Sequence, residues 1–441
     1  LAPPRATASS KLPVIVFYYG GGGNIGSAGS GMYDGEAMAK KGAIFVNIAY
    51  RLGILGYMAH PELTREQGGH SGNYAGLDQL AGLKWVHDNI ARFGGDPAHV
   101  AITGQSAGAG AVSTLIHAPL AKGLFQAAMM SSTCSLGAGS GGATLAEAEQ
   151  IGLDIQKRLG VSSLKQMRDV AADKLVALQN ESQVGYRLTG GVRVGPIIDG
   201  YFTPASKLEM MQSHRMSDIP VIANFNSGES SSPLQAAKTA ADYRQIAARL
   251  YGDASAEFLR LYPVSSDAEV APMAAKVARE ASIANASRNC GVMQAQYNKS
   301  PVFIDMYDRK HPYTPGVVFA DQNPATVGAY HNADIVYWFE NQDQFNRFRA
   351  TRNWTAWDRT LADEMAGALI AFARTGNPTT AAVKWPAWSA QNDAYVRFGD
   401  NVTVERFNAQ GMQWLAAHPV AGGGRGGRGA PGIVAGRGPR D

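Results

Sequence analysis

Cysteine and long apolar runs are scarce in this 441-residue chain, and each scarcity narrows what the protein can be. Only two cysteines occur, too few for a disulfide-rich scaffold or a cysteine-based zinc site. No apolar run reaches the roughly 18 residues that a membrane-spanning helix needs, so we expect no such span. Hydrophobic residues still make up 45% of the chain, which is ample for a large buried core.

Net charge is also small, and most of it lies at one end. Lysine and arginine total 40 against 36 acidic residues, a formal balance of +4. Residues 421–441 hold four arginines and one acidic residue, so the rest of the chain is nearly neutral. This segment has no aromatic side chain and cannot bury enough surface to offset its ordering entropy. We expect a single domain over residues 1–418 and a disordered Gly/Arg-rich tail over residues 419–441.

Several partner classes are disfavoured by the same composition. An Arg/Gly tail can bind nucleic acid through charge alone, but nothing in residues 1–418 supports that role, so a solvated terminus is the favoured interpretation. The nine histidines form no H-x-x-x-H pair beside a glutamate, and neither cysteine stands in a metal-ligand spacing. We therefore expect no metal, no other cofactor and no nucleic-acid partner.

The most informative segment is Gly104-Gln105-Ser106-Ala107-Gly108. It follows an apolar run at residues 100–103 and precedes a stretch of small residues with helical character. A serine between two glycines at a strand-to-helix turn is the nucleophile elbow of an α/β-hydrolase. The turn strains the backbone at the serine, and side chains two positions away on either side would collide. The pentapeptide therefore predicts Ser106 as a nucleophile.

A glycine run upstream supplies the second element. The buried-strand pattern of residues 13–18 ends in Tyr19-Gly20-Gly21-Gly22-Gly23. Glycines that leave a strand can point backbone N–H groups into a cavity, where they stabilise a tetrahedral oxyanion. A phosphate loop of the Walker type would need a Gly-Lys-Ser/Thr end, and none follows. The run favours an oxyanion hole.

An acid and a base follow in the order that α/β-hydrolases use. Glu229 lies in a polar turn directly after the apolar run 220–225, where the carboxyl end of a strand would place it at the edge of the sheet. His331 lies in a loop before the aromatic segment 335–339. We predict Glu229 as the acid and His331 as the base.

Two other residues compete for these roles. Asp199 also ends an apolar strand and is the reserve acid, although capping its own turn is the favoured role for this side chain. His311 precedes a proline and is the alternative base.

These blocks together resemble the type-B carboxylesterases, the group that includes cholinesterases, bile-salt-stimulated lipases and bacterial para-nitrobenzyl-type esterases. The resemblance runs from about Pro13 to Phe398. Besides the elbow and the two turns of Glu229 and His331, the matching blocks are residues 19–27, 47–53, 72–79, 85–90, 93–97 and 372–378.

The resemblance implies one α/β-hydrolase domain, with a mixed, mostly parallel central sheet flanked by helices. It implies a Ser106–Glu229–His331 triad, glutamate being the usual acid of this family. The oxyanion donors would be the N–H groups of Gly21, Gly22 and Ala107.

Two departures from the family pattern bear on substrate binding. Gly23 stands where the family usually has phenylalanine, so we expect a wider pocket and bulkier acyl or aromatic esters. Gln105 stands where glutamate is common, which removes a negative charge beside the nucleophile and argues against cationic, choline-like esters. We expect the remaining pocket walls near residues 134–145, 230–260 and 300–320.

The first residues and the cysteines give three further expectations. Relative to the family, the sequence begins about a hundred residues in, and residues 1–4 resemble the end of a strand, so we expect N-terminal strands to be missing. Family members from secretory pathways usually carry several disulfides; here we expect Cys134 and Cys290 to be buried free thiols, with a bridge between them as a minor alternative. The location stays open between secreted, periplasmic and other compartments, because the part of the family pattern that would carry a signal peptide is not in this sequence.

The sequence thus predicts a serine carboxylesterase that cleaves small-molecule esters through an acyl-enzyme. Two alternatives stay open. One is a non-catalytic adhesion or binding homologue of the same fold, and the other is carbamate or thioester cleavage on the same triad.

Overall fold

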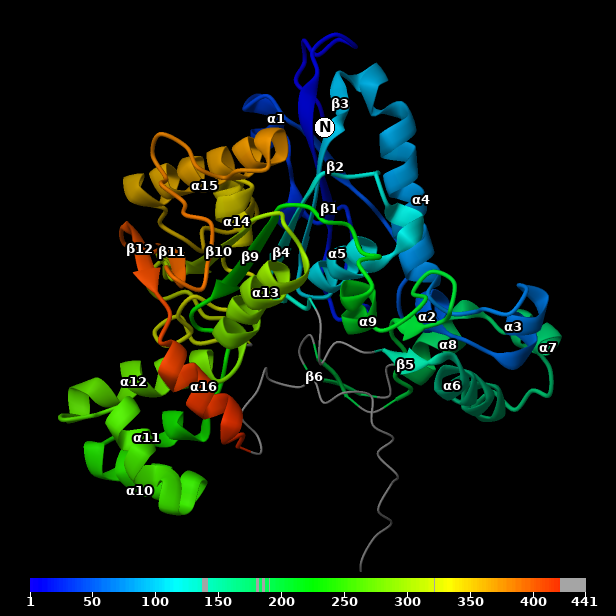
Figure 1. Ribbon diagram of the computed structural model, residues 1–441. Coiled ribbons are helices and arrows are strands. Elements are labelled where there is room, and N and C mark those ends of the chain that lie inside the picture. The colour runs from blue at the N-terminus through cyan, green and yellow to red at the C-terminus, as the bar shows by residue number, and fades with distance from the viewer. Residues whose placement is uncertain (137–141, 180–181, 185–186, 190, 321, 421–441) are drawn as a thin grey trace, which may run out of the picture.

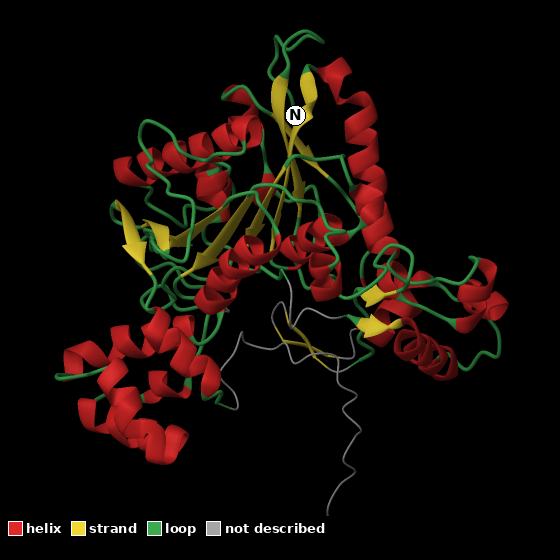
Figure 2. Cartoon of the chain, in the orientation of Figure 1, coloured by secondary structure: helices red, strands yellow, loops and turns green. Residues whose placement is uncertain are grey.

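The structure is a computed structural model that describes residues 1–136, 142–179, 182–184, 187–189, 191–320 and 322–420. A central sheet lies between helices on both faces, and two helical lobes extend from the edge of the sheet where its strands end (Figure 1). Figure 2 shows the same layers, with the strands in yellow between red helices. Residues 421–441, most of the predicted tail, lie outside the described residues.

Eight strands form the main sheet, in the order β12-β11-β10-β9-β4-β3-β1-β2. All neighbours pair in parallel except β11 and β12, which are antiparallel. The predicted mixed, mostly parallel sheet is therefore confirmed. The strands of this sheet are β1 (Leu12–Tyr18), β2 (Ile44–Asn47), β3 (Gly95–Gln105), β4 (Ala127–Ser131), β9 (Val221–Asn226), β10 (Val302–Tyr307), β11 (Ala394–Phe398) and β12 (Val402–Arg406). Two small pairs join β5 (Ala143–Thr144) to β8 (Ile197–Ile198) and β6 (Ser182–Val184) to β7 (Arg187–Thr189).

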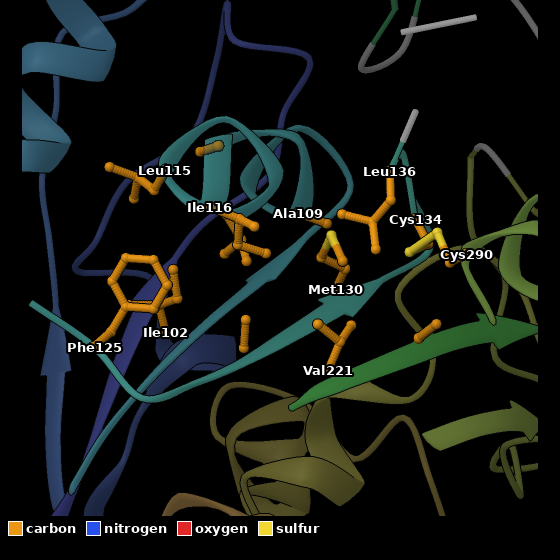
Figure 3. Close-up of a cluster of buried hydrophobic side chains, with 14 of the residues drawn as sticks. Ile102, Ala109, Leu115, Ile116, Phe125, Met130, Cys134, Leu136, Val221 and Cys290 are labelled. Atoms are coloured by element: carbon orange, nitrogen blue, oxygen red, sulfur yellow. A yellow bond between two sulfur atoms is a disulfide. The ribbon is translucent and has the colours of Figure 1, made fainter. Parts of the chain in front are cut away.

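Both faces of the sheet are buried, because parallel strands need helices on each side. Successive residues of β1 point to opposite faces, and Val14, Val16 and Tyr18 join one core cluster while Ile15 and Phe17 join the other. Figure 3 shows part of the first cluster, between the sheet and α5 (Ala107–His117). The helices against the first cluster are α4 (Tyr74–Asn89), α5, α9 (Lys207–Gln212) and α13 (Ile283–Tyr297). Those against the second are α1 (Glu36–Lys40), α14 (Ile335–Trp338) and α15 (Ala356–Thr375).

Each lobe has a small core of its own. One lobe contains α10 (Ala240–Tyr251), α11 (Ser255–Leu261), α12 (Asp267–Glu280) and α16 (Ala409–Ala417). The other contains α2 (Gly53–Tyr57), α3 (Pro61–Glu66), α6 (Leu145–Arg158), α7 (Leu164–Arg168) and α8 (Ala172–Gln179). Among the described residues, none of the helices combines the length and the hydropathy that a bilayer-spanning helix requires.

The two cysteines are not free thiols. Cys134, just after β4, is bonded to Cys290 on α13, with the Cα atoms 6.2 Å apart (Figure 3). The expectation of free thiols was wrong because 156 residues separate the two positions in sequence, and only the packing of α13 beside β4 brings them together. Both sulfur-bearing side chains are buried in the first core cluster.

The outer edge of β2 is partly covered by the first residue. Leu1 and Phe45 exchange two hydrogen bonds, each 2.9 Å between nitrogen and oxygen. Residues 1–4 therefore begin against the sheet edge, although they form no strand themselves.

Candidate functional site

Ser106 lies at the turn between β3 and α5. Its backbone has φ 58° and ψ −120°, a conformation that few residues other than glycine adopt. A Cβ at Gly104 would lie 2.3 Å from the carbonyl oxygen of Gly108, and one at Gly108 would lie 1.9 Å from that of Tyr18. These clashes explain the glycines two positions before and after the serine, as the sequence predicted.

The glycine run after β1 lies against this turn. A Cβ at Gly20 would come within 3.0 Å of the Ser106 Cβ, and one at Gly21 would lie 2.0 Å from the Ile25 carbonyl oxygen. Gly21, Gly22 and Gly23 all have positive φ, a backbone conformation that favours glycine at these three positions.

Three N–H groups remain free in this part of the site. The Gly21 carbonyl accepts from Asn24 and Ile25, both at 3.1 Å, which turns the loop back on itself. Among the residues that the structure describes, the N–H groups of Gly21, Gly22 and Ala107 donate to no protein acceptor. They are the N–H groups that the family resemblance implies as oxyanion donors, and that role stays a prediction.

Glu229 and His331 are in direct contact. His331 Nδ1 lies 2.5 Å from Glu229 Oε2, although 102 residues separate them. The Glu229 side chain is 1% exposed, whereas that of His331 is 43% exposed. The buried carboxylate accepts the Nδ1 hydrogen, which leaves the Nε2 lone pair of His331 open to a donor.

That donor is Gln105. Its amide Nε2 lies 3.2 Å from His331 Nε2, and the Gln105 side chain is buried. Within the described ranges, Ser106 Oγ makes no hydrogen bond to His331. Gln105, predicted as a substrate-binding residue, is thus a neighbour of the base in this structure.

Known proteins resemble this chain over nearly its whole length. Residues 1–414 match the Carboxylesterase family. The chain belongs to this family, as a type-B carboxylesterase. Fumonisin B1 esterase of Sphingopyxis macrogoltabida is 32% identical over 407 residues, which cover 90% of this chain and 72% of that protein. Para-nitrobenzyl esterase of Bacillus subtilis (strain 168) is 29% identical over 416 residues, covering 90% and 78% respectively.

Solved structures agree with this membership. A PNB esterase aligns with the carboxylesterase at a TM-score of 0.70 and 27% identity, covering 94% of this chain and 81% of that one. The Geobacillus stearothermophilus carboxylesterase EST55 aligns at a TM-score of 0.69 and 27% identity, over 93% and 83%. The predicted family, the α/β-hydrolase fold and the hydrolase class are therefore confirmed.

Asp199 and His311, the alternative acid and base, have other roles in the carboxylesterase. Asp199 Oδ1 accepts the N–H groups of Tyr201 (3.0 Å) and Thr203 (2.9 Å), so it caps its turn as the favoured interpretation held. His311 is buried, and its Nε2 donates to the Ala333 carbonyl at 2.8 Å. Burial lowers the pKa of His311 to about 3, so it is neutral and supports the loop that carries His331.

The space beside Gly23 is partly occupied by the side chain of another residue. Its backbone has φ 76°, and a Cβ would lie 3.2 Å from Tyr57 Cε2 on α2. The Tyr57 ring therefore stands beside the position where the family usually has a phenylalanine. Part of the predicted pocket wall, residues 137–141, lies outside the described residues, and none of the predicted site residues lines the 440 Å³ groove on α15.

Sequence reasoning missed the buried polar residues behind the site. Ser131 ends β4, Asn226 ends β9, and Asp334 directly precedes α14 as its N-cap. All three are buried and hydrogen-bonded to one another or to the loops of the site. Polar side chains at the carboxyl ends of buried parallel strands were the available signal. Within the described part of the chain, no cluster of His, Cys, Asp and Glu could hold a metal ion.

Proposed function

We propose that Ser106, Glu229 and His331 are the catalytic triad of this carboxylesterase. The observation that supports it best is the 2.5 Å contact between His331 and Glu229, at the sheet edge where the strained Ser106 turn lies. Each member follows the carboxyl end of a different strand or precedes a helix packed on the sheet, as ligand-binding groups of open α/β sheets do.

Acylation follows from these positions. Ser106 Oγ attacks the ester carbonyl while His331 Nε2 takes its proton, and the ionised Glu229 stabilises the imidazolium that forms. The tetrahedral oxyanion accepts hydrogen bonds from the N–H groups of Gly21, Gly22 and Ala107. His331 returns the proton to the leaving alcohol, which departs and leaves an ester on Ser106.

Deacylation repeats the same steps with water. His331 takes a proton from water as it attacks the acyl-enzyme, and the acid product leaves when the proton returns to Ser106. Before the first attack, the hydrogen bond from Gln105 to His331 Nε2 must give way to one from Ser106.

Substrate size is the finer part of the proposal. The half-exposed His331 ring supports esters with bulky acyl or aromatic groups, and Gly23 adds no side chain of its own to the pocket, although the Tyr57 ring lies beside it. Two relatives are named for their substrates, a fumonisin B1 esterase and a para-nitrobenzyl esterase, and the second name describes an aromatic ester. Activity confined to the smallest acetate ester would contradict this part alone.

The test is hydrolysis of para-nitrophenyl butyrate by the 441-residue chain beside its Ser106→Ala and His331→Ala variants. Each variant should lose about a thousandfold or more in turnover with little change in melting temperature. A fluorophosphonate should label the parent chain but not Ser106→Ala. Parent turnover that persists in either variant would remove that residue from the mechanism, and an inert, unlabelled parent would favour a non-catalytic homologue.

A further inference from the structure

One buried serine touches both sides of the proposed triad. The Ser131 carbonyl oxygen, at the end of β4, accepts the backbone N–H of Ser106 at 2.9 Å. The Ser131 hydroxyl lies 2.7 Å from Asp334 Oδ2, three residues beyond His331. The turn that carries the nucleophile is thereby tied to the loop that carries the base.

Asp334 extends this tie to the acid. Its Oδ1 accepts from Asn226 Nδ2 at 2.9 Å, and the same amide donates to the Tyr330 carbonyl at 2.9 Å. The backbone N–H of Asn226 donates to Glu229 Oε1 at 2.9 Å. Through Asn226, Asp334 therefore connects with the Glu229 turn and with the residue before His331.

Counting hydrogens shows where a proton is needed. The Ser131 hydroxyl has one hydrogen but two neighbouring oxygens, Asn224 Oδ1 at 2.6 Å and Asp334 Oδ2 at 2.7 Å. Asn224 directs its NH₂ group to Asp305 Oδ2 at 2.6 Å, so its oxygen faces Ser131 and can only accept. If Ser131 donates to Asn224, the contact with Asp334 requires a hydrogen on the carboxyl group.

The electrostatic environment of Asp334 also favours its protonated form. Asp334 is fully buried, and burial is the largest influence on its pKa and raises it; the hydrogen bonds from Asn226 and Ser131 lower the pKa, the charge of Glu229 raises it, and the net shift is upward. Among the described residues, no lysine, arginine or histidine forms an ion pair with Asp334. The titratable groups that face it are Glu229, Asp305, Tyr307 and Tyr330, none of which is a cation.

We propose that Asp334 is a positioning residue that works as a neutral carboxylic acid, donating to Ser131 and accepting from Asn226, so that one buried frame holds Ser106, Glu229 and His331. The proposal rests on the proposed function of that triad. A neutral Asp334 leaves Glu229 as the single negative charge beside the base. An ionised Asp334 would put a second negative charge into the same network and would repel that of Glu229.

Three variants test the role. Asp334→Asn keeps one donor and one acceptor in place, so kcat/KM should stay within about threefold of the parent and the acid limb of its pH profile should not move. Asp334→Ala and Ser131→Ala break the frame, and kcat should fall about tenfold or more while KM changes little. Melting temperatures of all three variants identify any loss that comes from unfolding.

Two results would overturn the proposal. If Asp334 were ionised, Asp334→Asn would remove a negative charge near His331 and shift the acid limb to lower pH. If the residue were only structural, Asp334→Ala would lower the melting temperature but leave kcat unchanged at temperatures where it is folded.

A measurement without turnover separates this proposal from the triad. Infrared difference spectra of the parent against Asp334→Asn at pH 8 should show the loss of one protonated-carboxyl band. Absence of the Asp334 band would refute the neutral acid even in an active esterase. An inert parent that shows the band would refute the triad but not the protonation.

Discussion

Tyr50 and Tyr19 each donate a hydrogen bond from the side-chain hydroxyl to the backbone carbonyl of the other residue. The Tyr50 hydroxyl donates to the Tyr19 carbonyl at 2.5 Å, the Tyr19 hydroxyl donates to the Tyr50 carbonyl at 3.1 Å, and their rings stack with centroids 4.3 Å apart. Tyr19 is the residue directly before the glycine run. This reciprocal pair therefore fixes the point at which the loop with Gly21 and Gly22 leaves β1.

Tyr50→Phe should loosen that loop. Burial raises the pKa of Tyr50, so its hydroxyl is a donor across the working pH range, and its loss leaves the buried Tyr19 carbonyl without its short bond. We expect a stability loss of about 1 kcal/mol and a kcat reduced by about three- to tenfold at similar KM.

The matched control is Tyr18→Phe, since the Tyr18 hydroxyl donates to the Gln79 carbonyl at 3.3 Å away from the glycine run. It should cost similar stability and leave kcat unchanged. Equal kcat values for the two variants would contradict a role for Tyr50 in the loop. Steady-state kinetics and urea unfolding supply both measurements.

Gln105→Glu should alter the pH dependence of esterase activity. The new carboxylate would lie where the amide now meets His331 Nε2 at 3.2 Å, and a negative charge there favours the imidazolium. The acid limb of kcat/KM should move to higher pH by about one unit, and activity at neutral pH should fall. Gln105→Met, which is uncharged, should leave the limb in place. An unmoved limb in Gln105→Glu would show that residue 105 does not face the base in solution.

The Cys134–Cys290 bridge should contribute strongly to stability. It closes a loop of 156 residues, for which loop-closure entropy gives about 3–5 kcal/mol. The double variant Cys134→Ala/Cys290→Ala should therefore melt well below the parent. Reductant should lower the melting temperature of the parent and leave that of the double variant unchanged. A parent that is insensitive to reductant even after unfolding and refolding would argue against the bridge.

Buried histidines should destabilise the fold in mild acid. Burial lowers the pKa of His117 to about 3, far below the ordinary value near 6.5. Below pH 6.5 His117 binds a proton in the unfolded chain but not in the folded chain. The contribution of His117 to the free energy of unfolding therefore falls as the pH drops from about 6.5 to about 3.

His117→Asn isolates this effect, because the Asn amide can replace the Nδ1 donor that now meets the Ser113 carbonyl at 2.7 Å. The variant should be less stable than the parent at pH 8, and this difference in the free energy of unfolding should be smaller by about 2 kcal/mol at pH 5. Denaturant unfolding at the two pH values gives the difference. A difference of constant size would mean that His117 in the folded chain takes up its proton between pH 8 and pH 5, as it does in the unfolded chain.

Much of the site could be predicted from the sequence, because it depends on local backbone geometry. The glycines around Ser106 and the run from Gly20 to Gly23 are required by turns only a few residues long. A polar turn after an apolar strand marked Glu229, and a loop before an aromatic segment marked His331. The order of these blocks along the chain was enough to predict the family and, with it, the mostly parallel sheet.

Contacts between distant segments were decided only by the tertiary structure. Cys134 and Cys290 pair because α13 packs beside β4, and the sequence pattern alone favoured free thiols. Gln105 faces His331, Tyr57 stands beside Gly23, and Asp334 meets Ser131 because separate strands end at one edge of the sheet. Local pattern specifies which turn a segment makes, whereas the packing of helices on the sheet determines which turns meet.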